Sequence, residues 1–128
     1  MARVLVVEDE PTMRELVSAR LKAAGHQILA ADSGAAAVEV VTLRGAPDVA
    51  VLDIGLPDID GYTLLASLRD AAGTKPFGAV FLSGELEQEF IDRGQGMGAI
   101  YLTKPFIASA LLKAIEQAME PVQADDGW

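Results

Sequence analysis

The chain has 128 residues, 51% of them hydrophobic, and a formal net charge of −9 that comes from 10 Lys and Arg against 19 Asp and Glu. This length and composition predict one globular domain with a substantial core. The acidic balance argues against direct binding to nucleic acid or to an anionic membrane surface, and the lack of cysteine excludes disulfides and thiolate metal sites. No apolar run is as long as a membrane span, and the first run starts at Val4 with no room for a leader, so we expect a cytoplasmic protein.

The predicted elements start with a strand at 4–7 and a helix that Pro11 opens and Gly25 ends. A strand at 28–31 leads to a helix with Ser33 as N-cap and Gly45 as stop, and strands at 49–52, 79–82 and 99–102 each precede a further helix. Among the predicted helices, the segment at 85–93 has the fewest apolar residues that could pack against the core. The apolar stripes that should face the core are Met13, Leu16, Val17, Leu21 and Ala24 in the first helix, Leu64, Leu65 and Leu68 in the third, Leu86, Phe90 and Ile91 in the fourth, and Leu111, Leu112, Ile115 and Met119 in the last.

The order of these elements predicts an α/β fold. The strand runs are continuously apolar, as strands are when helices cover both faces of a parallel sheet. Five strand–helix units are too few for an eight-stranded barrel, so we expect an open, doubly wound (βα)5 sheet. Glycines at 94, 96 and 98 should shorten or loosen the end of the fourth helix. We expect one domain over residues 1–120 and a disordered tail over residues 121–128.

Polar side chains follow four of the five strands, and parallel strands bring such residues to one edge of the sheet. These residues are Glu8, Asp9 and Glu10 after the first run, Asp53 after the third, Ser83 after the fourth and Lys104 after the fifth. Carboxylates without cysteine or a nearby histidine form a hard oxygen site suited to Mg²⁺. A divalent ion, a lysine and a hydroxyl are the groups that phosphoryl transfer needs, and one carboxylate can act as the nucleophile.

Four segments in this order resemble the receiver domain of response regulators in two-component signalling. They are the Glu8-Asp9 pair, D-I-G-L-P-D-I-D-G at 53–61, F-L-S-G at 81–84 and Y-L-T-K-P-F at 101–106. The resemblance covers roughly residues 3–120. It implies a flavodoxin-like, five-stranded parallel sheet with the strand order 2-1-3-4-5.

The resemblance also implies roles for individual residues around a bound Mg²⁺. Asp53 is the expected phosphoacceptor and a metal ligand. Asp9 should bind the ion directly, Glu8 through a water, and Gly55 through its backbone carbonyl. Glu10 lies outside the family pattern, and its place beside Pro11 predicts a helix-start acid that favours the helix dipole.

Three further residues are expected to respond to the phosphoryl group. Lys104 should pair with the phosphoryl oxygens and precede a cis peptide bond to Pro105. Ser83 should donate a hydrogen bond to the phosphoryl group, and Tyr101 is the expected aromatic switch that packs inward when Ser83 is drawn to the phosphate. His26, the single histidine, is predicted to lie in a loop and is assigned no role.

The predicted function is therefore a phosphorylation-dependent signalling receiver that catalyses only its own phosphoryl transfer and dephosphorylation. Its expected partners are a sensor histidine kinase or a histidine phosphotransfer protein, and a downstream protein target or output domain. The face formed by the fourth helix, fifth strand and fifth helix is the expected homodimer surface.

Two alternatives stay open at this point. The first is a small Mg²⁺-dependent aspartyl-phosphate hydrolase, although such enzymes usually carry a second Asp two residues after the nucleophile, where this chain has Gly55, and this chain has no inserted cap domain. The second is a binding module that keeps the fold without being phosphorylated.

Overall fold

Five parallel strands form one sheet with the order β2-β1-β3-β4-β5. The structure, a computed structural model, describes residues 2–84, 96 and 98–119. The strands are β1 (Arg3–Val7), β2 (Gln27–Ala31), β3 (Val49–Asp53), β4 (Gly78–Ser83) and β5 (Ile100–Thr103). The predicted α/β class and strand order are confirmed, whereas the predicted fourth helix at 85–93 and the tail at 121–128 lie outside the described residues.

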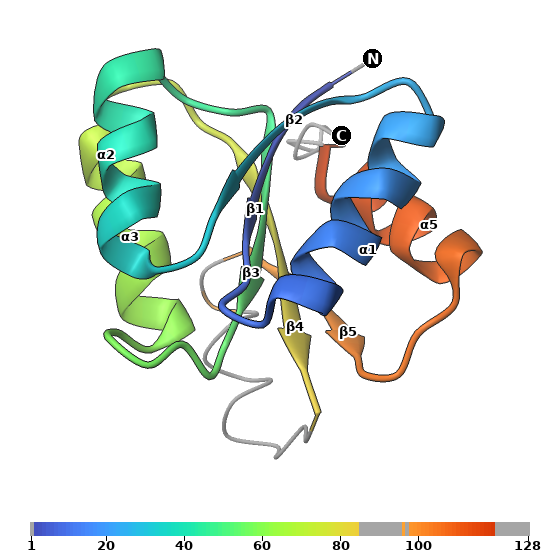
Figure 1. The fold of residues 1–128 in the computed structure, drawn as a ribbon. Coiled ribbons are helices and arrows are strands. Elements are labelled where there is room, and N and C mark those ends of the chain that lie inside the picture. Colours follow the sequence, from blue (N-terminus) through green and yellow to red (C-terminus); the bar gives the residue numbers. More distant parts are fainter. Residues whose placement is uncertain (1, 85–95, 97, 120–128) are drawn as a thin grey trace.

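Helices cover both faces of the sheet, as a doubly wound fold requires (Figure 1). α2 (Gly34–Arg44) and α3 (Gly61–Ala71) lie on one face, and α1 (Pro11–Ala23) and α5 (Ala108–Met119) lie on the other. Side chains of β1 alternate between two core clusters. Leu5 and Val7 point towards α2 and α3, whereas Val4 and Val6 point towards α1 and α5.

The ends of the first two helices follow the predicted capping signals. Pro11 occupies the first turn of α1, after Glu10 as N-cap. The Ser33 hydroxyl accepts a hydrogen bond from the Ala36 amide at the start of α2, and Gly45 ends that helix with φ of +86°. Positive φ is readily available to glycine, so the helix stops there.

Three burial predictions were wrong. Ala24 is exposed, because it is the C-cap residue just past the end of α1. Leu16 is 45% exposed, because the buried line of α1 consists of Val17 and Leu21, one turn apart, and Leu16 lies one residue off that line. β2 is not covered on both faces: Leu29 is 38% exposed, whereas β3 is buried throughout. β2 is an edge strand, where fewer helices meet the sheet.

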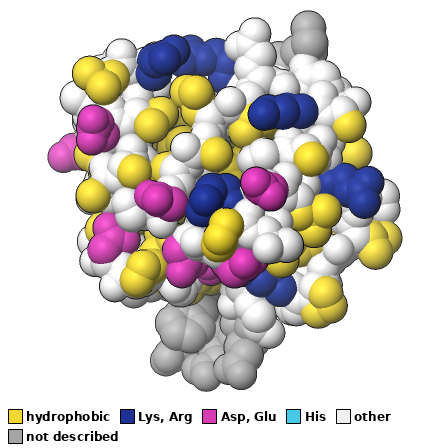
Figure 2. Space-filling view, viewed as in Figure 1, with side chains coloured by type: hydrophobic (Ala, Val, Ile, Leu, Met, Phe, Trp, Pro, Cys, Tyr) yellow, Lys and Arg dark blue, Asp and Glu magenta, His cyan; other side chains and the backbone are white. Residues whose placement is uncertain are grey.

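Acidic, basic and apolar side chains are interspersed on the face of the molecule drawn in Figure 2. This mixed surface differs from the basic stripe that is typical of nucleic-acid-binding proteins. None of the helices within the described residues is long and apolar enough to cross a membrane.

Candidate functional site

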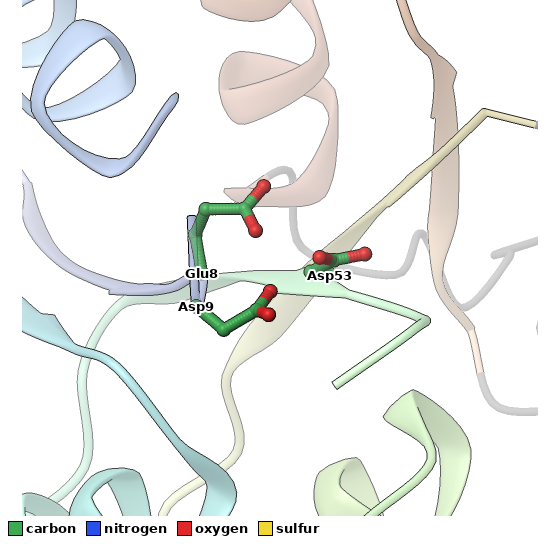
Figure 3. Close-up of side chains that lie close together, drawn as sticks. All are labelled: Glu8, Asp9 and Asp53. Atoms are coloured by element: carbon green, nitrogen blue, oxygen red, sulfur yellow. The ribbon is translucent and has the colours of Figure 1, made fainter. Parts of the chain in front are cut away.

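Three carboxylates converge at the carboxyl ends of β1 and β3, the two central strands nearest the point where the strand order reverses. Glu8 and Asp9 directly follow β1, and Asp53 is the last residue of β3. One oxygen from each lies within 4.8 Å of the others. Figure 3 shows the three side chains directed towards a common space. The structure thus brings together the acids that the sequence predicted to share an edge.

The burial of these acids is uneven. Glu8 is 1% exposed and Asp53 is 8% exposed, whereas Asp9 is exposed to solvent. Two buried carboxylates repel each other and lose hydration, which is costly unless a cation or hydrogen-bond donor lies among them.

Lys104 supplies that cation. Its Nζ lies 2.8 Å from Glu8 Oε1 and 3.6 Å from Asp53 Oδ2. The predicted cis peptide bond joins Lys104 to Pro105, and the Lys104 amide donates to the Ser83 carbonyl at 2.7 Å. Lys104 therefore bridges the two buried acids from the far side of β4. Its stronger pairing with Glu8 was not predicted, because the sequence gives no distance between residues 96 positions apart.

The electrostatics of the cluster follow from this arrangement. Burial raises the pKa of Glu8 to about 7; a hydrogen bond with Asp53 acts in the same direction, and Lys104 acts against it. Burial opposes the charge on Lys104, but the hydrogen bond to Glu8 and the charge of Asp53 outweigh it and leave the pKa of Lys104 above its ordinary value. The site holds more negative charge than one lysine neutralises, which favours binding of a further cation.

The set of donors fits Mg²⁺. Carboxylate oxygens are its preferred protein ligands, and the ion keeps several waters, so a partly open cluster of three acids is suitable. Asp9 is the exposed member and faces the solvent from which a hydrated ion arrives. Gly55 lies beside the cluster, where its amide donates to Asp53 Oδ1 at 3.0 Å.

Ser83 lies in β4 and Tyr101 lies in β5, the strand that Lys104 follows. Ser83 ends β4 and pairs with Thr103 of β5, one residue beyond the partner of Asp53 in the sheet register. Tyr101 is half-buried, with its ring 5.6 Å from that of Phe81. Its hydroxyl lies 2.6 Å from that of Tyr62, at the start of α3. No sequence pattern predicted this Tyr62 partner, because packing of α3 on the sheet brings it to a residue 39 positions away.

Two residues with acid or base chemistry stay outside the cluster, as predicted. The Glu10 carboxylate accepts hydrogen bonds from the amides of Thr12 and Met13, which lower its pKa and make it the N-cap of α1. His26 lies in the turn after α1, where its Nδ1 accepts a hydrogen bond from the Ala2 amide at 3.1 Å.

Comparison with known proteins agrees with this geometry. A family model described as the response regulator receiver domain matches residues 4–116. Protein PilH of Pseudomonas aeruginosa is 32% identical over 120 residues, which cover 93% of this chain and 98% of PilH. Response regulator protein FleR of the same organism is 36% identical over 114 residues, but this chain spans only 24% of FleR.

Solved structures support the same assignment. Chemotaxis protein CheY4 of Vibrio cholerae superposes with a TM-score of 0.81 at 29% identity, covering 92% of this chain and 98% of that one. The fold, the strand-end acids and these matches agree with one another. The chain belongs to the response regulator receiver domain family, whose members serve phosphorylation-dependent signalling.

Proposed function

We propose that this receiver accepts a phosphoryl group on Asp53, from a phosphohistidine of a sensor histidine kinase or a histidine phosphotransfer protein, in a Mg²⁺-dependent reaction. The observation that carries the proposal is the convergence of Asp53 with Glu8, Asp9 and Lys104 at one edge of the sheet. Such a cluster combines a nucleophilic carboxylate with groups that stabilise a transferred phosphoryl group.

In this reaction an Asp53 carboxylate oxygen attacks phosphorus while the phosphorus–nitrogen bond to the donor imidazole breaks. The imidazole leaves with the electron pair of that bond, and the product is an acyl phosphate on Asp53. The hydrogen bond from the Gly55 amide to Asp53 Oδ1 fixes the carboxylate and leaves Oδ2, which faces Lys104, as the better-placed nucleophile.

The charges around Asp53 suit the product as well as the reactants. Bound Mg²⁺ would be held by Asp9, Asp53 and the Gly55 carbonyl, with Glu8 acting through a water, and would neutralise charge on the phosphoryl oxygens. Lys104, 3.6 Å from Asp53 Oδ2 and 2.8 Å from Glu8, can turn from Glu8 to the phosphoryl group.

Output is proposed to pass through the surface around Ser83, Tyr101 and Lys104. A hydrogen bond from Ser83 to the phosphoryl group would shift β4, and Tyr101, which packs on Phe81 of that strand, would respond. The partner is proposed to be a downstream protein or an output domain. The proposed homodimer face includes β5, α5 and the fourth-helix segment, which lies outside the described residues.

Of the two alternatives, the hydrolase is the less well supported. Gly55 takes the place of the second aspartate that such enzymes usually carry, and it has no side chain to move a proton. We propose that catalysis is limited to phosphorylation of the chain itself and to loss of that phosphoryl group.

The test is phosphorylation by a small acyl-phosphate donor, followed by intact-mass measurement. The parent should gain one base-labile phosphoryl group with Mg²⁺ and none with a chelator, and Asp53→Asn should gain none at that site. Multiple turnovers of donor with no covalent product would favour the hydrolase. No modification with donor and Mg²⁺ in excess would favour the binding module.

A further inference from the structure

The loop between β3 and α3, residues 54–60, is bonded to the sheet at its start and closed at its base by a second backbone hydrogen bond. The Ile54 amide donates to the Leu82 carbonyl at 3.1 Å, and the Gly61 amide donates to the Ile54 carbonyl at 3.1 Å. Glycine suits this close approach, because a Cβ at Gly61 would lie 3.0 Å from the Ile54 Cα and 3.3 Å from the Asp53 carbonyl oxygen. These contacts hold the base of the loop and leave its outer part to be fixed by something else.

Asp58, near the middle of the loop, binds the start of a different element. Its Oδ1 accepts from the Gly34 amide and its Oδ2 from the Ala35 amide, each at 3.1 Å, so the carboxylate spans the first two residues of α2. The Ser33 hydroxyl takes the third amide, that of Ala36. The first turn of α2 is therefore capped from two sources, of which one belongs to the loop that follows Asp53.

The chemistry of this contact is that of a helix N-terminus with an anion. The amides of Gly34 and Ala35 stabilise the charged form of Asp58 and lower its pKa. Asp58 therefore stays ionised, and the contact persists, throughout the neutral pH range.

Packing strengthens the same contact. Gly34 is buried, and a Cβ at that position would collide with Cγ2 of Ile59 and lie 3.3 Å from Asp58 Oδ2. Both residues at the outer part of the loop thus lie directly against the backbone of α2, which leaves no room for the loop to shift towards the helix.

We propose that Asp58 is a positioning residue, which holds the β3–α3 loop against α2 so that Gly55 stays beside Asp53 and can offer its carbonyl to Mg²⁺. This inference rests on the proposed function, because it concerns the metal site of that reaction. The link is physical: Gly55 lies between the fixed base of the loop and the Asp58 contact, and its amide is bonded to Asp53 Oδ1.

The test compares Mg²⁺ affinity, measured by calorimetry, in the parent and four variants. Asp58→Ala removes both hydrogen bonds, and Asp58→Asn retains one acceptor oxygen. Gly34→Ala pushes on Ile59 without changing any charge. Ser33→Ala is the matched control, because it removes a cap from the same helix turn whose hydrogen bond goes to the Ala36 amide and not to the loop. Thermal denaturation of each variant in chelator measures the cost to the fold separately.

We expect Asp58→Ala and Gly34→Ala to raise the Mg²⁺ dissociation constant by roughly ten-fold, with Asp58→Asn in between and Ser33→Ala unchanged although it is less stable. The inference would be overturned if Asp58→Ala and Gly34→Ala both bound Mg²⁺ with a dissociation constant within two-fold of the Ser33→Ala value. Weaker binding in Asp58→Ala but not in Gly34→Ala would also overturn it, since charge alone would then be responsible. If Asp58→Ala does not fold, Asp58→Asn and Gly34→Ala decide the question.

The outcomes separate this inference from the proposed function. A parent that binds no Mg²⁺ would contradict the proposed function. If the parent binds Mg²⁺ and is phosphorylated, but Asp58→Ala and Gly34→Ala bind Mg²⁺ as tightly as Ser33→Ala does, only the role of Asp58 would be contradicted.

Discussion

Glu8 should make the free energy of unfolding fall as pH rises through the weakly acidic range. The folded protein holds the pKa of Glu8 at about 7, raised from an ordinary value of 4.5. Below the ordinary value, both the folded and the unfolded chain are protonated at this group. Between 4.5 and about 7 the unfolded chain releases the proton while the folded chain keeps it, so the folded state binds more protons and loses stability with rising pH.

The size of the effect follows from the pKa shift. A rise from 4.5 to about 7 corresponds to about 3 kcal/mol, reached near neutral pH and constant above it. Burial of the side chain, which is 1% exposed, is the main cause.

The assay is chemical denaturation in chelator at several pH values between about 4.5 and 8, comparing the parent with Glu8→Gln. Contributions from groups that do not contact Glu8 cancel in the difference between the two proteins. The stability of Glu8→Gln relative to the parent should grow by about 3 kcal/mol across this range.

Glu10→Gln is the control, since it makes the same change two residues away. The folded protein lowers the pKa of Glu10 below its ordinary value of 4.5. Glu10 therefore adds to the free energy of unfolding above that pH and loses this contribution as pH falls, so its effect has the opposite sign to that of Glu8. Profiles for Glu8→Gln and the parent that stay parallel within about 0.5 kcal/mol would refute the reasoning.

Three other predictions concern the site and the fold around it. Lys104→Met should lower the free energy of unfolding by about 3 kcal/mol at pH 8, because two buried acids lose their cation. The loss should be much smaller at pH 5.5, where Glu8 is protonated, and equal losses at both pH values in denaturation experiments would count against the prediction. Tyr62→Phe and Tyr101→Phe should each cost about 1 kcal/mol, and the double variant less than their sum, because both remove one hydroxyl–hydroxyl bond; additive costs would show that the pair is not coupled. Gly78→Ala should cost about 1–3 kcal/mol by thermal or chemical denaturation, because its Cβ would lie 2.7 Å from the Ala118 carbonyl carbon of α5. Gly84→Ala is the control, because no atom of the described residues lies within 4 Å of the added Cβ, and an equal loss there would contradict the steric argument.

The sequence predicted those features that depend on local pattern and on the rule for strand ends. Apolar runs placed the strands, and Pro11, Ser33 and Gly45 placed helix ends, because capping involves neighbouring residues. Glu8 and Asp53 could be expected to meet because parallel strands end at one edge whatever the details of packing.

The sequence did not predict features that depend on distances between remote segments. Lys104 was expected to pair with the phosphoryl oxygens. Its 2.8 Å contact with Glu8 was not predicted, because it depends on how β5 and the following loop pack. The contact between Asp58 and α2 also depends on long-range packing. The sequence did not predict it, because an aspartate in a loop that contains Gly and Pro is typical of an ordinary turn. Leu16 was misplaced because helical periodicity alone does not define how wide the buried stripe is.

The most direct test of the central claim is to locate the phosphoryl group. The protein is incubated with Mg²⁺ and an acyl-phosphate donor, treated with borohydride to reduce any acyl phosphate to an alcohol, and digested for peptide mass spectrometry. We predict reduction at Asp53 and at no other acid, with Glu8 and Asp9 unchanged. Reduction at Asp9 or Glu8 instead, or no reduced residue at all, would contradict the account.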